Sequence, residues 1–243
     1  MNAVRIARHA ASQTKQAMPP LRQEKAMILV TGFQSYAGRS ANPSEQVASA
    51  LNGMTIGGMA VRGQGLAVDF HQVRRDLPAM IDALRPRAVV SLGLWPGEPM
   101  IRIERMAANW SWFELPDNAG HRQNGKVVDD GPDGYLTSLP ADAMQAAIRS
   151  AGRPCRQSGS AGTYLCNATT YIALHHCARN HPDTICGFIH LPYLPAQVAE
   201  LLNEVADEGR LEMHQRADLA SMHLDDMVDS LKIGLDVIAR SLA

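Results

Sequence analysis

Met27-Ile28-Leu29-Val30-Thr31, followed by Gly32, is the stretch of sequence that decides the fold. A short, unbroken apolar run of this kind is typical of a strand buried on both faces, as in a mostly parallel sheet. Similar runs recur at residues 88–94 and 184–195, with amphipathic segments between them. The alternation of buried strands and helices predicts an α/β fold, in which a single domain has a twisted, mostly parallel sheet with helices on both faces.

Helices are expected wherever apolar residues recur at helical spacing or a capping residue precedes such a run. Ser44, which follows Asn42-Pro43, is the expected N-cap of the first helix. The predicted helices cover residues 44–52, 74–84, 141–151, 166–176 and 220–242.

Two further strand regions are weaker in the sequence. Residues 60–61 and 66–68 are expected to pair through a hairpin at Gly63-Gln64-Gly65. Residues 101–105 alternate in polarity, which predicts a strand with Arg102, Glu104 and Met106 on one face. The surrounding region, residues 95–140, is long and polar, and a region of this kind in a compact domain usually covers a site.

Composition narrows the classes of protein to consider. The chain has 243 residues, 46% of them apolar, and a formal net charge of -1. This charge does not predict a nucleic-acid partner, and the sequence lacks the run of roughly 18 apolar residues that a membrane helix needs, so we expect a soluble protein. The chain has four cysteines, Cys155, Cys166, Cys177 and Cys186, and none of them form a CxxC pair. This pattern predicts free thiols and a cytoplasmic location.

The first 26 residues differ in composition from the rest. They carry five basic residues against a single acidic one, Glu24, and Pro19-Pro20 would interrupt any helix. We expect a disordered or accessory extension, or a start codon assigned too early, with residues 27–243 as the single α/β domain. An organelle transit peptide is the less favoured alternative.

Cys166 is the first candidate for chemistry. Small, turn-forming residues at 158–163 change at Cys166 into apolar residues at helical spacing, which places this thiol at the start of a helix. The free N–H groups and the dipole at a helix start stabilise an anion, so a thiol there is biased toward thiolate. A lone cysteine is more often a small buried apolar residue, so further residues have to support this interpretation.

His190 and Glu104 are the further residues. His190 lies at the tip of the third apolar run, and Glu104 lies in the polar region, so all three side chains are expected at one end of the sheet. By itself, a glutamate between Arg102 and Arg105 indicates a surface ion pair. Together, thiol, imidazole and carboxylate are the set that nucleophilic catalysis requires.

Longer motifs around these residues resemble the pyroglutamyl peptidase type I family of cysteine peptidases, also called pyrrolidone-carboxylate peptidases. The segment at 160–167, Ser-Ala-Gly-Thr-Tyr-Leu-Cys-Asn, resembles the nucleophile motif of the family, and residues 188–197 resemble its histidine motif. The resemblance extends from about residue 27 to 197. Shorter similar elements lie at residues 29–33, 42–44, 104–109, 116–120 and 130–132.

The resemblance implies specific roles. Cys166 would be the nucleophile, His190 the general base and acid, and Glu104 the group that orients His190. The implied reaction is hydrolysis of the bond after an N-terminal pyroglutamyl residue through an acyl-enzyme, without metal or cofactor. The substrates would be peptides or amides with N-terminal pyroglutamate, and relatives often assemble into dimers or tetramers.

The expected substrate pocket is apolar, since a pyroglutamyl lactam has no ammonium group. Phe33 and Tyr36, on the loop after the first strand, are expected to flank the lactam ring, with Asn42 and Leu94 also at the pocket. Backbone N–H groups at the Cys166 helix start would form part of an oxyanion hole.

Three departures from the family pattern concern the substrate rather than the chemistry. Ser35-Tyr36-Ala37 stands where the family usually has Pro-Phe-Gly, Leu94 follows Gly93 where Gln is common, and Glu114 occupies a position that is usually arginine. We therefore expect changes in affinity and specificity.

Other functions remain open at this point. A thiol amidohydrolase of the same fold, acting on a different small acyl amide, is the first alternative. A non-catalytic binding relative or nucleotide-binding module is the second, although no GxGxxG follows a predicted strand. A metal site is not favoured, because the spacing HHxxxxH lacks i,i+4 pairing and indicates solvated histidines at a helix end. The candidate ligands for such a site are His175, His176, His181 and Asp183.

Overall fold

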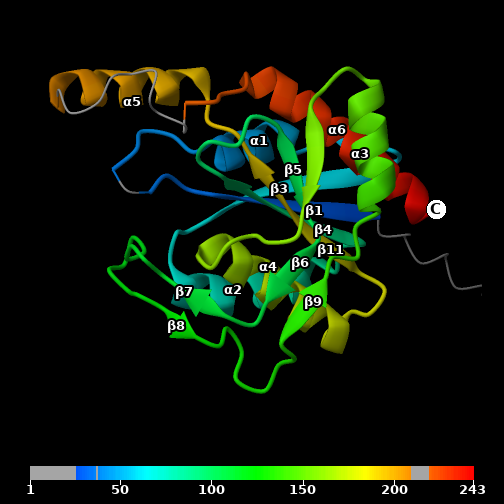
Figure 1. Cartoon of the computed structure of the whole chain (residues 1–243). Helices are drawn as coiled ribbons and strands as arrows, with labels where there is room; N and C mark the ends of the chain where they lie inside the picture. Colours follow the sequence, from blue (N-terminus) through cyan, green and yellow to red (C-terminus); the bar gives the residue numbers. More distant parts are fainter. Residues whose placement is uncertain (1–25, 37, 209–218) are drawn as a thin grey trace, which may run out of the picture.

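A seven-stranded sheet forms the centre of the computed structural model, which describes residues 26–36, 38–208 and 219–243 (Figure 1). Its strand order is β10-β5-β11-β4-β1-β3-β2. The expected first strand lies inside the sheet, between β3 and β4. The bounds are β1 Met27–Phe33, β2 Thr55–Ile56, β3 Met59–Leu66, β4 Ala88–Leu94, β5 Ile101–Glu104, β10 Cys155–Ser158 and β11 Ile185–Leu191.

The mostly parallel sheet is confirmed. β1 pairs in parallel with β3 and β4, and β4 pairs in parallel with β11. β5 and β10 are parallel to each other, but β5 runs antiparallel to β11, and the short β2 runs antiparallel to β3. The direction of β5 determines where Glu104 lies.

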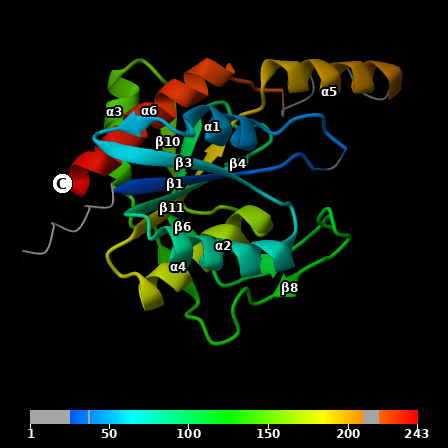
Figure 2. The same ribbon diagram turned by 180° about the vertical axis from the view of Figure 1, so that it is seen from behind.

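Helices cover both faces of the sheet, as expected. α1, α3 and α6 lie on one face, and α2 and α4 lie on the other (Figures 1 and 2). Side chains of β1 alternate between the two cores, with Ile28 and Val30 toward α1 and α6 and Leu29 toward α2 and α4. The bounds are α1 Pro43–Leu51, α2 Phe70–Leu84, α3 Ala141–Ser150, α4 Leu165–Asn180, α5 Pro195–Glu208 and α6 Leu224–Ser241.

The long polar region folds into small strands rather than one loop. β6 and β9 form one two-stranded sheet, and β7 and β8 form another. Asn109 fixes the connection after β6, because its Oδ1 accepts the N–H groups of Val127 and Val128 while its Nδ2 donates to two carbonyls. The bounds are β6 Met106–Ala108, β7 Ser111–Trp112, β8 Asn124–Gly125 and β9 Gly134–Leu136.

Two expected strand features are wrong. The hairpin through Gly63-Gln64-Gly65 is absent, because these residues belong to the continuous strand β3. The turn lies instead at Gly57-Gly58, where both residues have positive φ (55° and 82°). Met106 does not share a face with Glu104, since the chain leaves the sheet after β5 and Met106 pairs with Leu136 of β9.

The predicted start of α1 is displaced by two residues. Asn42, not Ser44, is the N-cap, and its side chain accepts the N–H of Ser44 while Pro43 begins the helix. α2 begins at Phe70, four residues before the predicted start, because Asp69 caps it. It ends before Arg85, as expected.

The cysteines, the helices and the N-terminal extension were also subjects of predictions from the sequence. All four cysteines are free, as predicted. None of the helices within the described ranges combines the length and apolar character needed to cross a bilayer. The predicted extension lies, up to residue 25, outside the described residues.

Gly63 provides a test of the packing of α1 on β3. A Cβ atom at Gly63 would lie 1.9 Å from the backbone oxygen of Ala48, which cannot move without shifting α1. We expect Gly63→Ala to lower the free energy of unfolding by about 1–3 kcal/mol, measured by urea denaturation. Gly159→Ala is the matched control, since no atom of the described residues lies within 4 Å of its Cβ position. Equal stability of the two variants would contradict the described contact.

Candidate active site

His190 and Glu104 form the buried centre of the site. Neither residue is exposed (both 0%), and His190 Nδ1 lies 2.7 Å from Glu104 Oε1. A carboxylate only accepts hydrogen bonds, so Nδ1–H donates and Nε2 carries the lone pair. Nε2 has no hydrogen-bond partner among the residues that the structure describes. The imidazole is therefore held in the tautomer that can accept a proton.

The antiparallel pairing of β5 with β11 brings these two side chains together. Glu104 lies opposite Phe188 and Arg102 lies opposite His190. Residues two apart on a strand share a face, so Glu104 and His190 are diagonal neighbours on one face. Because β5 runs back toward the middle of β11, Glu104 lies inside the sheet. The interpretation of Glu104 as a surface ion pair is therefore wrong.

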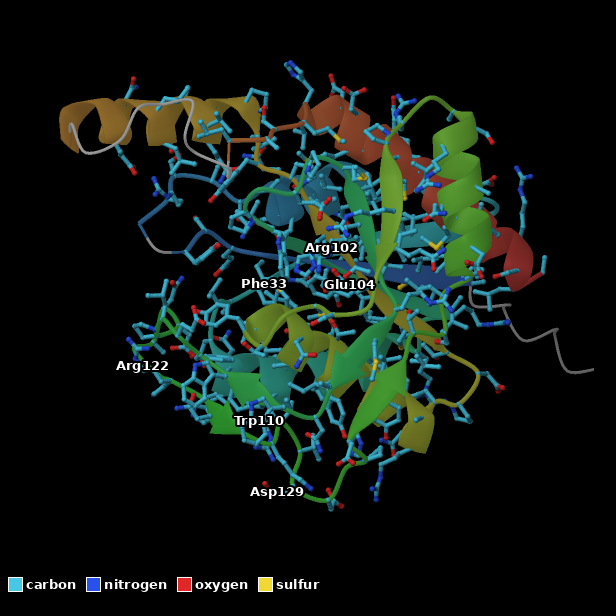
Figure 3. All side chains as sticks on the ribbon, viewed as in Figure 1. Phe33, Arg102, Glu104, Trp110, Arg122 and Asp129 are labelled. Atoms are coloured by element: carbon cyan, nitrogen blue, oxygen red, sulfur yellow. The ribbon has the colours of Figure 1, made fainter. Side chains whose placement is uncertain are left out.

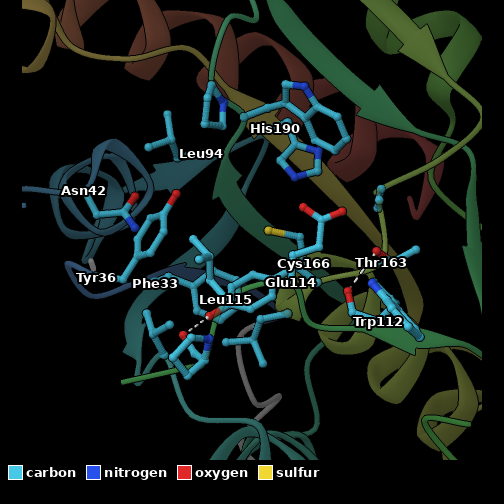
Figure 4. A pocket seen from close by; sticks show the side chains of 18 residues that line it. Phe33, Tyr36, Asn42, Leu94, Trp112, Glu114, Leu115, Thr163, Cys166 and His190 are labelled. Atoms are coloured by element: carbon cyan, nitrogen blue, oxygen red, sulfur yellow. Dashed lines mark hydrogen bonds between the residues drawn. The ribbon is translucent and has the colours of Figure 1, made fainter. Parts of the chain in front are cut away.

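Cys166 approaches the same site from the start of α4. It is the second residue of the helix, as expected from the sequence. Gly93 of β4 is the register partner of His190 in β11. A Cβ atom at Gly93 would lie 2.9 Å from the Sγ atom of Cys166. Cys166 and His190 line one cavity, toward which both side chains point (Figure 4). Only glycine at position 93 leaves room for the sulfur against the sheet.

Two aromatic rings fix the plane of the His190 ring. Trp95 meets it edge-on with ring centroids 4.9 Å apart, and the ring of Phe188 lies 4.8 Å away. Trp95 follows β4 directly, so the end of that strand positions it. With the Glu104 hydrogen bond, these contacts leave the imidazole little freedom to rotate.

Arg102 supplies positive charge beside the carboxylate. Its Nε lies 2.7 Å from Glu104 Oε1, as an ion pair outside hydrogen-bond geometry, and the two residues lie close together in Figure 3. Its Nη2 donates to the carbonyl of Ser160, and its guanidinium lies 3.8 Å from the centroid of the Trp95 ring. Arg102 thus joins Glu104, Trp95 and the segment before Cys166 in one buried network.

Burial shifts the pKa values of the thiol and the imidazole toward their neutral forms. Burial raises the pKa of Cys166 to about 12, with a further contribution from the negative charge of Glu104, and a hydrogen bond from the backbone opposes the rise only in part. Burial also lowers the pKa of His190, against the effect of Glu104. The expected bias of Cys166 toward thiolate is therefore wrong, because loss of solvent outweighs the helix start.

A cavity of about 480 Å³ opens in front of Cys166. The four residues predicted to hold substrate, Phe33, Tyr36, Asn42 and Leu94, all line it (Figure 4). The polar atoms of Asn42 are already used, since its Oδ1 accepts from Ser44 and its Nδ2 donates to the carbonyl of Gln34. Asn42 shapes the wall of the cavity.

The arrangement can carry out acyl transfer. A thiol, a neutral imidazole that accepts its proton, and a carboxylate that orients the imidazole meet beside a largely apolar cavity. One family model, described as Pyroglutamyl peptidase, matches residues 26–241 of the chain. This chain belongs to the pyroglutamyl peptidase family.

Individual relatives agree with this membership. A pyrrolidone-carboxylate peptidase of Pyrococcus furiosus is 35% identical over 178 residues, which cover 73% of this chain and 86% of the relative. One from Chromobacterium violaceum is 36% identical over 211 residues, covering 86% and 91%. A solved structure of a mutant pyrrolidone carboxyl peptidase from P. furiosus matches with a TM-score of 0.81 and 32% identity, covering 89% of this chain and all of that one (100%).

Sequence reasoning missed several residues of this pyroglutamyl peptidase site. Trp95 and Arg102 were not assigned to it, and neither was Trp112, which lines the cavity while 51% exposed. The position of Trp95, directly after a buried strand, is the signal that could have identified it. Arg102 carried no such signal, since its role depends on the β5–β11 register.

The protonation states lead to a pH prediction for this pyroglutamyl peptidase family member. Neutral His190 is the proton acceptor and burial lowers its pKa, so we expect kcat/KM to rise with pH through a midpoint below the ordinary pKa of a histidine. Above it, the rate should stay level to about pH 9, because the neutral thiol transfers its proton only during attack.

The profile should be measured with a neutral substrate. A fall in kcat/KM between about pH 8 and 9 would instead indicate an imidazolium–thiolate pair at rest and would contradict the described pKa shifts.

Proposed function

We propose that this chain is a cysteine peptidase that hydrolyses the bond after an N-terminal pyroglutamyl residue. The observation that carries the proposal is the hydrogen bond of 2.7 Å from His190 Nδ1 to Glu104. It leaves His190 Nε2 without a partner among the described residues, and His190 lines the same cavity as Cys166. Cys166 is the nucleophile, His190 the general base and acid, and Glu104 the orienting group.

The reaction proceeds in two balanced steps. His190 Nε2 takes the thiol proton as Sγ bonds to the pyroglutamyl carbonyl carbon, and this proton then passes to the departing amine as the C–N bond breaks. A thioester remains. Water attacks the thioester after losing a proton to His190, pyroglutamate leaves, and the proton returns to the sulfur. Glu104 stabilises the imidazolium that forms in each step.

The first turn of α4 offers donors for the developing oxyanion. The first N–H groups of any helix lack intrahelical partners. Asn42 and Asp69 cap α1 and α2 with their side chains, but Tyr164, at the N-cap of α4, makes no such hydrogen bond. Uncapped N–H groups beside Cys166 support a role in an oxyanion hole, where one donor contributes about 3–4 kcal/mol in transition-state stabilisation.

The lining of the cavity suits an uncharged lactam. Phe33, Tyr36 and Leu94 provide apolar surface, and burial keeps the pKa of the Tyr36 hydroxyl above its usual range, so it remains a neutral donor. An ammonium group would require a buried acidic partner. Glu104 is already paired with Arg102 and His190, and Glu114, which lines the cavity, is exposed, so neither is the buried partner that an ammonium group needs.

A second candidate function rests on Leu94 and Tyr36. Both line the cavity at positions that differ from the family pattern, so a different small acyl amide is the alternative substrate for the same chemistry.

A fluorogenic pyroglutamyl amide tests the function, with the corresponding prolyl amide beside it. We expect turnover of the pyroglutamyl amide only, since the prolyl amide carries an ammonium group. Cys166→Ala should lower kcat/KM at least about 10³-fold by removing the nucleophile. Cys155→Ala is the matched control, because this buried thiol lies in β10, outside the cavity. Comparable turnover of the prolyl amide would favour the alternative, and activity in Cys166→Ala would remove this residue from the mechanism.

Glu114 leads to a prediction about the residue that follows pyroglutamate. Its side chain lines the cavity as a carboxylate (Figure 4). We expect a pyroglutamyl-arginine substrate to have a kcat/KM about fivefold above that of pyroglutamyl-glutamate, which corresponds to about 1 kcal/mol for a partly exposed charge pair.

In Glu114→Gln the preference should disappear while turnover of pyroglutamyl-alanine stays unchanged. A preference that persists in this variant would show that Glu114 does not face the departing peptide.

We also propose a cytoplasmic location, which the free cysteines support. Two further statements stay predictions. One is that the N-terminal 26 residues form a separate extension, and the other is that the chain assembles into a dimer or tetramer.

A further inference from the structure

Asp82, His176 and His181 form a cluster that the peptidase reaction does not use. The Nε2 atoms of His176 and His181 each lie 2.7 Å from Oδ1 of Asp82. One ligand atom from each residue lies within 4.8 Å of the other two. The cluster joins the C-terminal ends of α2 and α4, and none of its residues lines the cavity at Cys166.

The histidine spacing in the sequence did not reveal this cluster. His176 is in α4, but His181 is the C-cap residue, with non-helical backbone (φ −139°). The i,i+4 rule for helical metal ligands does not apply to it, because the chain turns back beyond the helix end. Both imidazoles are largely buried (side chains 16% and 19% exposed), so the expectation of solvated histidines is wrong.

The other two sequence candidates lie elsewhere. His175 Nδ1 lies 3.0 Å from the Tyr135 hydroxyl, and Asp183 is not part of the cluster. Asp82, the third ligand, is 94 residues before His176 in the chain, and only the packing of α2 on α4 brings it there.

We propose that Asp82, His176 and His181 bind a zinc ion, with a water molecule as fourth ligand. Two imidazole nitrogens and one carboxylate oxygen are a donor set that zinc accepts in tetrahedral geometry. The ion would tie the end of α2 to the end of α4, far from the nucleophile. This inference does not rest on the proposed function.

The nitrogen–oxygen distances require only a small adjustment. Ligand atoms at about 2.0–2.1 Å from zinc are about 3.3 Å apart in a tetrahedron. The nitrogen–oxygen distances of 2.7 Å must therefore open slightly, and the Asp82 side chain, 54% exposed, can move outward. Each ring keeps one proton, which moves from Nε2 to Nδ1 as Nε2 binds the metal.

The surroundings of His176 can support that tautomer. Its Nδ1 lies 3.1 Å from the side-chain amide nitrogen of Asn180. Rotation of this amide would give up the hydrogen bond from Nδ2 to the His176 carbonyl and would present Oδ1 to the new Nδ1–H. The latter is the outer hydrogen bond that metal-bound histidines usually make.

A second cluster shows why donor identity alone is insufficient. Asp69, Asp117 and His121 also have ligand atoms within 4.8 Å of one another. However, Asp117 accepts backbone N–H groups from Phe70, Ala119 and His121, so its oxygens are already used to hold the loop. Within the part of the chain that the structure describes, Asp82 Oδ1 accepts only from the two imidazoles that would become ligands.

Zinc titration by isothermal calorimetry tests the site. The full chain carrying Cys166→Ala is used, so that zinc cannot bind the catalytic thiol. We expect one zinc per chain, and saturating zinc should raise the Tm by about 5 °C. In this background, His176→Ala and His181→Ala should each abolish both effects. His175→Ala is the matched control on the same helix and should retain them.

Two further measurements test the site if a histidine variant folds poorly: zinc binding by Asp82→Asn, and the visible spectrum of the cobalt-bound protein. Asp82→Asn preserves side-chain volume at an exposed position and should weaken binding at least tenfold. Cobalt should give visible bands of tetrahedral coordination without a sulfur charge-transfer band. The proposal is overturned if the parent protein binds no zinc, if His176→Ala and His181→Ala bind it as the parent does, or if cobalt reports a cysteine ligand.

Discussion

The site depends on the hydrogen bond between His190 Nδ1 and Glu104 Oε1, which is 2.7 Å long and fully buried. It exists because β5 runs antiparallel to β11 in a sheet that is otherwise mostly parallel. If β5 ran parallel to β11, Glu104 would not lie beside His190. The local reversal of strand direction thus converts an ordinary glutamate into the group that selects the tautomer of the histidine.

Burial of this pair has a cost that the neighbouring residues offset. An unpaired carboxylate in the sheet would be strongly unfavourable, and Arg102 supplies the opposite charge within the same β5 strand. Arg102 is itself stabilised by the Trp95 ring and by the Ser160 carbonyl. Burial also shifts the pKa of the thiol upward and the pKa of the imidazole downward, which favours proton transfer coupled to attack.

The two ends of α4 have different roles. Its first turn holds Cys166 against Gly93, where no side chain fits between sulfur and sheet. Its last turn and C-cap hold His176 and His181 against Asp82 of α2. The helix therefore connects the reactive end of the sheet with a polar cluster at the opposite end, and its alignment on α2 affects both.

The sequence by itself determined the α/β class, the strands β1, β4 and β11, the helix start at Cys166 and the motifs of the family, because buried strands and helix starts have local patterns. It did not determine the turn at Gly57-Gly58, the N-cap Asn42 or the course of the chain after β5, where several local solutions compete. Only the tertiary structure decided that Glu104 is buried, that the pKa of Cys166 is raised and that Asp82 meets two histidines. These properties depend on strand direction, exclusion of solvent and packing between distant helices, and none of these is encoded within one segment of the chain.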